Sequence, residues 1–106
     1  MPLALHPEAN DELVTASEWY ERQKPGLGTA FSSEVFRALE VLEEEPETWL
    51  EWPGVLHAPP IRRFLLWDFP FALPFMVLED RVVVLAVAHI RRRPGYWLER
   101  AESLTP

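Results

Sequence analysis

The sequence contains no cysteine and no long apolar run. Without cysteine, the 106-residue chain has no disulfide framework, no thiolate nucleophile and no cysteine-ligated zinc or iron-sulfur site. No apolar run approaches the roughly 18 to 20 residues that cross a bilayer, and the amino end has no basic region followed by an apolar one. We therefore expect an unexported cytoplasmic protein that makes no contact with a membrane.

Ligand-binding patterns are also missing. Of the three histidines, neither His6 nor His57 stands at metal-ligand spacing to another histidine or carboxylate. Gly26 and Gly28 do not form a phosphate loop, because they join two predicted helices rather than a strand and a helix. The sequence therefore predicts no metal and no cofactor.

Basic residues are scarce in the first half of the chain. Residues 1–53 hold 3 Lys and Arg against 12 Asp and Glu, whereas residues 54–106 hold 7 against 5. The net charge of -7 opposes binding to nucleic acid, since phosphate repels an acidic surface. A chain polarised in this way can avoid anions with one face and attract them with another, although solubility alone also explains the acidic surplus.

Apolar residues recur at helical spacing in two segments. Ala9, Leu13, Ala16 and Tyr20 lie on one face of a first helix, which starts near a proline at position 7. After a Pro-Gly-Leu-Gly break the same spacing resumes and continues to a proline at position 46. Residues 7–46 are therefore predicted to form an antiparallel helical hairpin.

The period becomes strand-like after an irregular loop at residues 47–60. Three β-rich segments, 61–68, 71–78 and 81–89, are separated by hairpin-sized breaks, which predicts an antiparallel meander. The segment 81–89 is apolar at nearly every position, as expected for a central strand. Pro74 removes a ladder donor, so its strand needs a bulge or an orientation that leaves this nitrogen unpaired.

These elements predict a single α+β domain, residues 1–106. Its order is a short N-terminal strand, the helical hairpin and three antiparallel strands within residues 61–90, with the helices packed on one face of the sheet. Residues 91–106 are predicted to be a C-terminal tail. For residues 98–106 the pattern leaves both a further helix and a loose tail open.

Several segments together resemble the RelE/ParE superfamily of toxins from type II toxin-antitoxin and plasmid-stabilisation systems, and the resemblance spans most of the chain. The segments are His6-Pro-Glu-Ala9 with Glu12 and Leu13, Trp19-Tyr20-Glu21, Pro25-Gly-Leu-Gly28 with Phe31, Arg62-Arg63, Phe69-Pro70-Phe71, Val84 to His89, Arg92-Arg93-Pro94 and Tyr96-Trp97. The resemblance implies a RelE/ParE-like fold, growth inhibition and a cognate antitoxin that wraps the toxin. A homodimer or a toxin-antitoxin hetero-oligomer is the expected assembly.

The resemblance implies one of two targets. ParE-like toxins bind DNA gyrase and need no catalytic residues, whereas RelE-like toxins are ribosome-dependent mRNA endonucleases and are as a rule strongly basic. With a sequence pI near 4.9 the chain departs from the second group, which favours a bacterial gyrase inhibitor over an endoribonuclease. An inactive toxin retained as an antitoxin-binding regulator is the third alternative.

A ribonuclease of this type would need an acid, a base and cations close together. If the chain is one, the candidate catalytic residues are His89, Arg63 and Tyr96. Histidine has a suitable pKa for such work, but alternation places His89 on the strand face of Val83, Leu85 and Val87, where a structural role is favoured.

The candidate target-binding residues combine cations and aromatic rings. Arginine can clamp a phosphate or carboxylate with two parallel hydrogen bonds. Successive side chains along a strand point to opposite faces. The three consecutive arginines at positions 91–93 therefore cannot all point the same way, and Arg62 and Arg63 also point to opposite faces. Tyr96 and Trp97 are better interpreted as aromatic rings that cap the core and hold the C-terminal tail in place. The full candidate set is Arg62, Arg63, Arg91, Arg92, Arg93, Tyr96 and Trp97.

Overall fold

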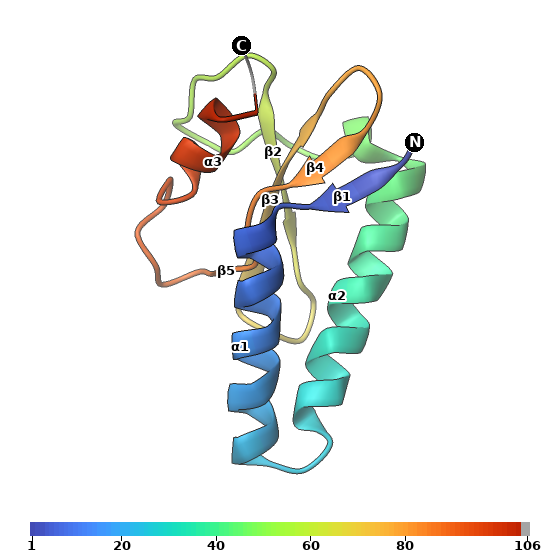
Figure 1. The fold of residues 1–106 in the computed structure, drawn as a ribbon, viewed down its shortest axis with the longest axis vertical. Coiled ribbons are helices and arrows are strands. Elements are labelled where there is room, and N and C mark those ends of the chain that lie inside the picture. Colours follow the sequence, from blue (N-terminus) through green and yellow to red (C-terminus); the bar gives the residue numbers. More distant parts are fainter. Residues whose placement is uncertain (105–106) are drawn as a thin grey trace.

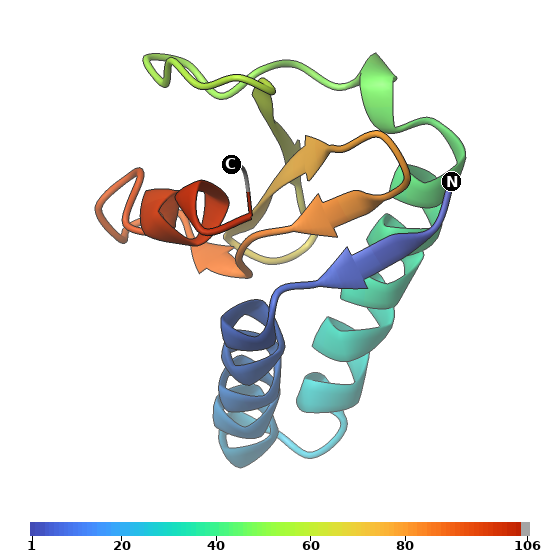
Figure 2. The ribbon, with the colours of Figure 1, turned by 45° about the horizontal axis from the view of Figure 1, so that its top comes forward.

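The computed structural model describes residues 1–104, and it shows a helical hairpin packed against one face of a five-stranded sheet (Figure 1). A short third helix lies on the other side of the sheet from the hairpin (Figure 2). The predicted α+β class is confirmed. The elements in chain order are β1 (Leu3–Leu5), α1 (Pro7–Gln23), α2 (Leu27–Glu44), the 3-10 turn η1 (Pro46–Thr48), β2 (Ile61–Leu65), β3 (Phe71–Val77), β4 (Val82–Val84), β5 (Ala88–His89) and α3 (Leu98–Glu102).

The start of α1 is fixed by its first residues. Pro7 occupies the first turn, where a helix tolerates proline, and the Glu8 amide donates to Nδ1 of His6 at 3.1 Å. The helix ends at Gln23, where the backbone of Lys24 becomes extended. The predicted helical hairpin is present as α1 and α2, and α2 ends at Glu44.

The turn between the two helices depends on glycine. Gly26 has a φ of +90°, in the region that L-residues rarely adopt, and the amides of Gly26 and Gly28 donate to the Glu21 carboxylate at 2.9 and 3.0 Å. A Cβ atom on Gly28 would lie 2.4 Å from the Ser17 carbonyl oxygen. The two helices therefore approach each other closely only because this position has no side chain.

The sheet has the order β1-β4-β3-β2 and is mixed. Strands β2, β3 and β4 pair antiparallel as predicted, whereas β1 adds to the edge of β4 in the parallel direction, with Ala4 beside Val83. All three residues of β4 are buried, which confirms the central position expected from its apolar sequence.

The predicted single strand at residues 81–89 is wrong. Phe75 pairs with Val84, but Ala72 pairs with Ala88, so two residues of β3 oppose three residues of the facing chain. This is a β-bulge, and it lies opposite Pro74, whose ring nitrogen has no hydrogen to give to a ladder. The bulge at residues 85–87 separates β4 from β5 and reverses the alternation of side chains beyond it.

The two faces of the sheet bury separate clusters. The cluster under the helical hairpin is closed by α1 and α2, and the second lies under α3, where Trp97 is fully buried. The first contains Leu13, Phe31, Val35, Ala38, Leu39, Leu42, Leu66, Phe71, Leu73, Phe75, Val82, Val84 and Val87. The second contains Ile61, Met76, Val83, Leu85, Ala86, Ala88, Trp97 and Ala101.

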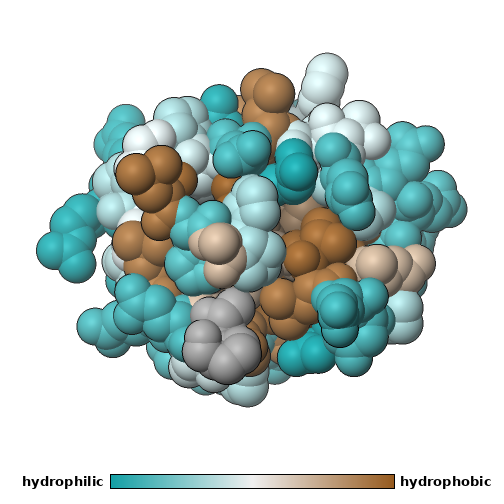
Figure 3. Space-filling model, turned by 90° about the horizontal axis from the view of Figure 1, so that it is seen from above, coloured by the Kyte–Doolittle hydropathy of each residue, from teal (hydrophilic) through white to brown (hydrophobic). Residues whose placement is uncertain are grey.

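The remaining segments are irregular but packed. Residues 47–60 form the predicted loop, although Glu51 makes an isolated antiparallel bridge with Arg62. Within the predicted tail, residues 98–102 form α3, and residues 105 and 106 lie outside the described part of the chain. Seen from above, apolar side chains at this end gather in separate areas between polar ones (Figure 3). No helix within residues 1–104 is long and apolar enough to cross a membrane.

Candidate functional site

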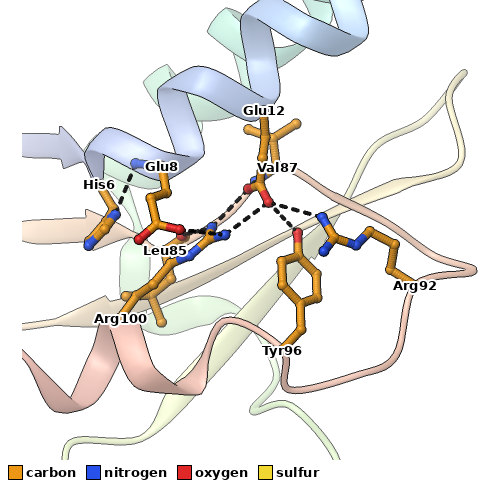
Figure 4. Close-up of polar contacts among 8 residues, drawn as sticks. All are labelled: His6, Glu8, Glu12, Leu85, Val87, Arg92, Tyr96 and Arg100. Carbon is orange, nitrogen blue, oxygen red and sulfur yellow. Dashed lines mark hydrogen bonds and ion pairs between the residues drawn. The ribbon is translucent and has the colours of Figure 1, made fainter.

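The carboxylate of Glu12, on the second turn of α1, connects the helical hairpin to the C-terminal segment (Figure 4). It accepts hydrogen bonds from the Tyr96 hydroxyl at 2.7 Å and from Nη1 and Nη2 of Arg100 at 2.9 and 3.1 Å. Arg92 reaches the same carboxylate at 3.4 Å. The side chains of Glu12 and Arg100 are only 16% and 10% exposed, so their ion pair is shielded from solvent.

This ion pair also completes the β-bulge. The bulge leaves the Val87 amide and the Leu85 carbonyl without ladder partners, and buried backbone groups need partners. Val87 donates to Oε1 of Glu12 at 3.1 Å, and Nη1 of Arg100 donates to the Leu85 carbonyl at 2.9 Å. The bulge lies opposite Pro74, which lacks a backbone donor. The position of this proline therefore explains where α1 and α3 are attached to the sheet.

Glu12 changes the acid-base properties of its partners. Burial raises the pKa of Tyr96, and the hydrogen bond and negative charge of Glu12 raise it further, against the lowering effect of Arg92 and Arg100. Burial by itself would lower the pKa of Arg100, but Glu12 more than reverses this, so the pKa of Arg100 lies above its usual value. A neutral Tyr96 hydroxyl donating to a carboxylate is poorly suited to proton transfer near neutral pH.

The arginines of the C-terminal segment divide by role. The guanidinium of Arg92 lies 3.7 Å from the centre of the Tyr96 ring, and its side chain is 55% exposed. Arg91 and Arg93 are exposed and make no ion pair within residues 1–104. These two cations are therefore free to meet a partner, whereas Arg92 is shared between Glu12, the Tyr96 ring and solvent.

His89 lies at the end of β5, and the bulge changes its face. Val87 belongs to the cluster under the helices, whereas Val83 and Leu85 belong to the cluster under α3, so the predicted common face of all four residues is wrong. Nδ1 of His89 accepts the Arg91 amide at 3.0 Å. The imidazole ring packs against Phe71 at 5.1 Å and lines a groove beside α1.

That groove has a volume of about 650 Å³. One wall is the outer side of α1 and the other is formed by β3, β5 and the segment that follows. Its floor is apolar, and Asp11, Glu12 and Arg92 bring charge to its lining. The lining residues are Asp11, Glu12, Thr15, Ala16, Trp19, Tyr20, Pro70, Phe71, Val87, His89 and Arg92.

The two arginines of β2 lie apart from this groove. Arg62 donates to the Trp49 carbonyl at 2.8 Å, which gives it a structural role at the top of the sheet. The neighbouring side chains Ile61 and Phe64 belong to opposite clusters, so Arg62 and Arg63 point to opposite faces as predicted. Arg63 lines none of the described cavities that His89 or Tyr96 line, so the candidate catalytic trio is not assembled.

Trp97 is the one candidate target-binding residue that the structure contradicts. Its ring is 0% exposed and packs edge-to-face on Trp52 at 5.0 Å, so it offers no surface to a target. This agrees with the alternative interpretation of the C-terminal aromatics as core residues. Tyr96 is half-buried, and the guanidinium groups of Arg92 and Arg100 lie over its ring.

Sequence reasoning missed the residues that organise this site, Glu12 and Arg100. They stand 88 positions apart, so no local spacing relates them. Glu12 follows Glu8 by one helical turn, and both reach Arg100, but a pair of carboxylates on a helix is ordinarily a solvated face. Within residues 1–104 no group of three histidine, aspartate or glutamate side chains could hold a metal ion.

The fold is one that solved structures share. Eight chains of solved structures match, and one of them is described as the chromosomal ParDE TA system from P. aeruginosa. The two chains superpose with a TM-score of 0.73 at 19% sequence identity, over 84% of this chain and 95% of that chain. No protein-family model matches this chain, and no curated protein matches it. The similarity therefore establishes a ParE-like fold.

Proposed function

We propose that this chain is the toxin of a type II toxin-antitoxin system and that it inhibits growth by binding DNA gyrase. The observation that carries the proposal is the fold, which the chain shares over nearly its whole length with a component of a ParDE system. Because a fold alone does not define a function, the groove and the C-terminal segment supply the rest of the argument.

The groove beside α1 is suited to a helical partner. Its apolar floor, with Ala16, Trp19 and Phe71, matches the mode in which an amphipathic helix lays its apolar face into a groove. Trp19 is half-exposed in the free chain, as expected of a ring that a partner covers. We propose that the antitoxin places such a helix here, with basic residues near Asp11, which has no ion-pair partner in residues 1–104.

Inhibition by binding is favoured over RNA cleavage. Tyr96, which a nuclease would need for proton transfer, is engaged by Glu12, and Arg63 lines neither of the cavities that His89 and Tyr96 line. An acidic chain with a net charge of -7 is repelled by ribosomal RNA. Arg91 and Arg93 remain as exposed cations, and we propose that they contact the target protein.

The proposal is tested by inducing the chain in bacteria with and without the neighbouring antitoxin gene. We expect growth arrest only without the antitoxin, intact transcripts, and loss of supercoiling when purified gyrase is mixed with the purified chain. Unchanged supercoiling at excess protein would rule out gyrase inhibition. Cut transcripts that disappear with His89→Ala would identify RNA cleavage as the activity instead. Absence of arrest would identify an inactive regulator.

Matched variants separate the two surfaces. The double variant Arg91→Glu, Arg93→Glu should abolish gyrase inhibition and keep antitoxin binding, because it changes only exposed side chains outside the groove. Trp19→Glu should do the reverse, since a charge on the apolar floor opposes a docked helix. If either variant weakens both activities equally, the assignment of separate surfaces is wrong.

A further inference from the structure

The turn between β2 and β3, yellow in Figure 1, is held by a buried carboxylate of α2. Glu34 is the only buried charged side chain within residues 1–104, and it accepts the amides of Trp67 and Asp68. Burying a carboxylate is costly unless such bonds satisfy it. The conformation of this turn is therefore strongly specified.

The same turn exposes a tryptophan. Trp67 is 92% exposed, and it stands beside Leu65 and Val41, which are also exposed apolar residues. Together with Arg37, Ala38 and Phe64 these side chains line a second cavity of about 210 Å³ between α2 and the edge of the sheet. Tryptophan and arginine dominate the energetics of protein interfaces.

Half of the β2 edge is open. The amide of Leu66 donates to the Phe71 carbonyl at 2.9 Å, so alternation directs the even-numbered residues of β2 to β3 and the odd-numbered residues outward. Ile61 and the amide of Arg63 bond to the segment at residues 50–52. Beyond it, the Arg63 carbonyl and the amide and carbonyl of Leu65 have no backbone partner within residues 1–104.

The chain itself shows what this edge accepts. The carbonyl of Ile61 takes the Trp52 amide at 2.7 Å, and the Arg63 amide donates to the Leu50 carbonyl at 3.0 Å, so residues 50–52 lie antiparallel to β2. Leu50, Glu51 and Trp52 alternate apolar and acidic side chains. An extended acidic-apolar segment is thus already paired with the first half of the edge.

Charge favours the same kind of segment on the open half. Arg63 points to the face of the sheet opposite the second cavity, because Ile61, two residues before it, belongs to the cluster under α3. The side chain of Arg63 makes no ion pair within residues 1–104. The acidic residue nearest to Arg63 in sequence is Asp68, whose side chain is exposed. An arginine without an ion pair in the described residues is available to an acidic segment, even on a chain with a net charge of -7.

We propose that the open half of the β2 edge, from Arg63 to Leu65, is a docking site for an extended acidic-apolar peptide segment of a partner protein. The segment adds an antiparallel strand, places an apolar side chain in the cavity beside Trp67 and directs its acidic side chains, on the opposite face, to Arg63. The site is separate from the groove beside α1. It does not depend on the proposed toxin activity.

The proposal is tested with the full chain, isotope-labelled, and a short synthetic peptide of alternating glutamate and valine. We expect saturable shifts of the Leu65 and Trp67 amide signals. A peptide with lysine in place of glutamate should bind at least about tenfold more weakly, because like charges face Arg63. Since the whole chain is acidic, non-specific attraction would give the opposite order.

Variants test the backbone pairing. Leu65→Pro removes one outward amide at an edge position that tolerates proline, and Leu65→Val keeps it. We expect about tenfold or more loss of peptide affinity for Leu65→Pro and for Trp67→Ala, and little change for Leu65→Val. Unchanged affinity in both weakened variants, or shifts confined to the groove beside α1, would overturn the proposal. A dimer of the free chain that Leu65→Pro dissociates would also overturn it, because the occupant would then be a second copy.

Discussion

Two helix carboxylates, Glu12 of α1 and Glu34 of α2, hold distant segments in different ways. Glu12 is matched by the cation of Arg100, with Tyr96 and a bulge amide around it. Glu34 has no cationic partner within residues 1–104 and is satisfied by the backbone amides of the β2-β3 turn. The first arrangement joins elements from both ends of the chain, whereas the second fixes a single turn.

The difference has a consequence for function. Around Glu12 the charges of the C-terminal segment are largely used internally, which leaves Arg91 and Arg93 at the surface. Around Glu34 only backbone is used, so the side chain of Trp67 is left fully available. Replacing either glutamate by alanine should therefore disturb a different surface and lower the free energy of unfolding by a different amount.

The largest expected effect is that of Glu12→Ala. It leaves Arg100 buried without its main partner and removes the acceptor of the Val87 amide, which should lower the free energy of unfolding by about 3 to 5 kcal/mol. The control is Glu8→Ala, because the exposed Glu8 reaches the same arginine at 3.3 Å and should contribute less than about 1 kcal/mol. Denaturant unfolding of both variants measures the difference. Equal losses would show that the burial of the Glu12 pair does not matter.

A smaller loss is expected for Glu34→Ala. Two turn amides lose their acceptor, at a cost of about 1 to 3 kcal/mol, but no charge is left unpaired. The amides of Trp67 and Asp68 should also exchange hydrogen faster, while those of the C-terminal segment should not. Glu40→Ala, at an exposed position of the same helix, is the control. A loss larger than that of Glu12→Ala would reverse the comparison.

Tyr96→Phe tests the contribution of one donor to Glu12. Removing a hydrogen bond to a carboxylate should cost about 1.5 kcal/mol at neutral pH. Because the pKa of Tyr96 is raised above 10.0 in the folded chain, this stabilisation is fully present below about pH 10, where an unfolded tyrosine begins to ionise, and it is lost as the pH rises from there toward the higher pKa of the folded chain. Unfolding measured from pH 8 to about 12 should therefore show the two proteins converging. Parallel curves would contradict the assignment.

The smallest effect is expected for Arg92→Ala. Its contact with Glu12 is long, at 3.4 Å, and its side chain is half-exposed, so the ion pair and the contact with the Tyr96 ring together should contribute about 0.5 to 1 kcal/mol. The loss should decrease in high salt. A salt-independent loss comparable with that of Tyr96→Phe would show that Arg92 acts as a core residue.

Much of the fold could be predicted from local patterns. Apolar spacing located both helices, and the glycine break between them, at Gly26 and Gly28, marks a turn with a positive φ and a close helix contact. Three of the strands followed from period-two segments. Pro74 correctly indicated a bulge or an unpaired nitrogen, because a missing donor is a local property of the residue.

The organisation of the candidate site could not be predicted in the same way. The bulge adds one residue opposite Pro74 and so reverses which side chains beyond it face the helices, which moved His89 away from its expected neighbours. Trp97 also changed from a candidate contact to a core residue, since α3 closes over the second face of the sheet. Alternation fails as a guide wherever the register shifts.

By itself the sequence determined the class of the domain, the positions of its two long helices and of β2 and β3, and the surplus of cations near the C-terminus. Those properties depend on neighbouring residues, whose spacing is visible along the chain. Only the tertiary structure decided that Glu12 pairs with Arg100 and that Glu34 holds the turn on which Trp67 is exposed. Such contacts join residues far apart in sequence, and they form because buried backbone groups and charges must find partners once the sheet and its bulge have packed.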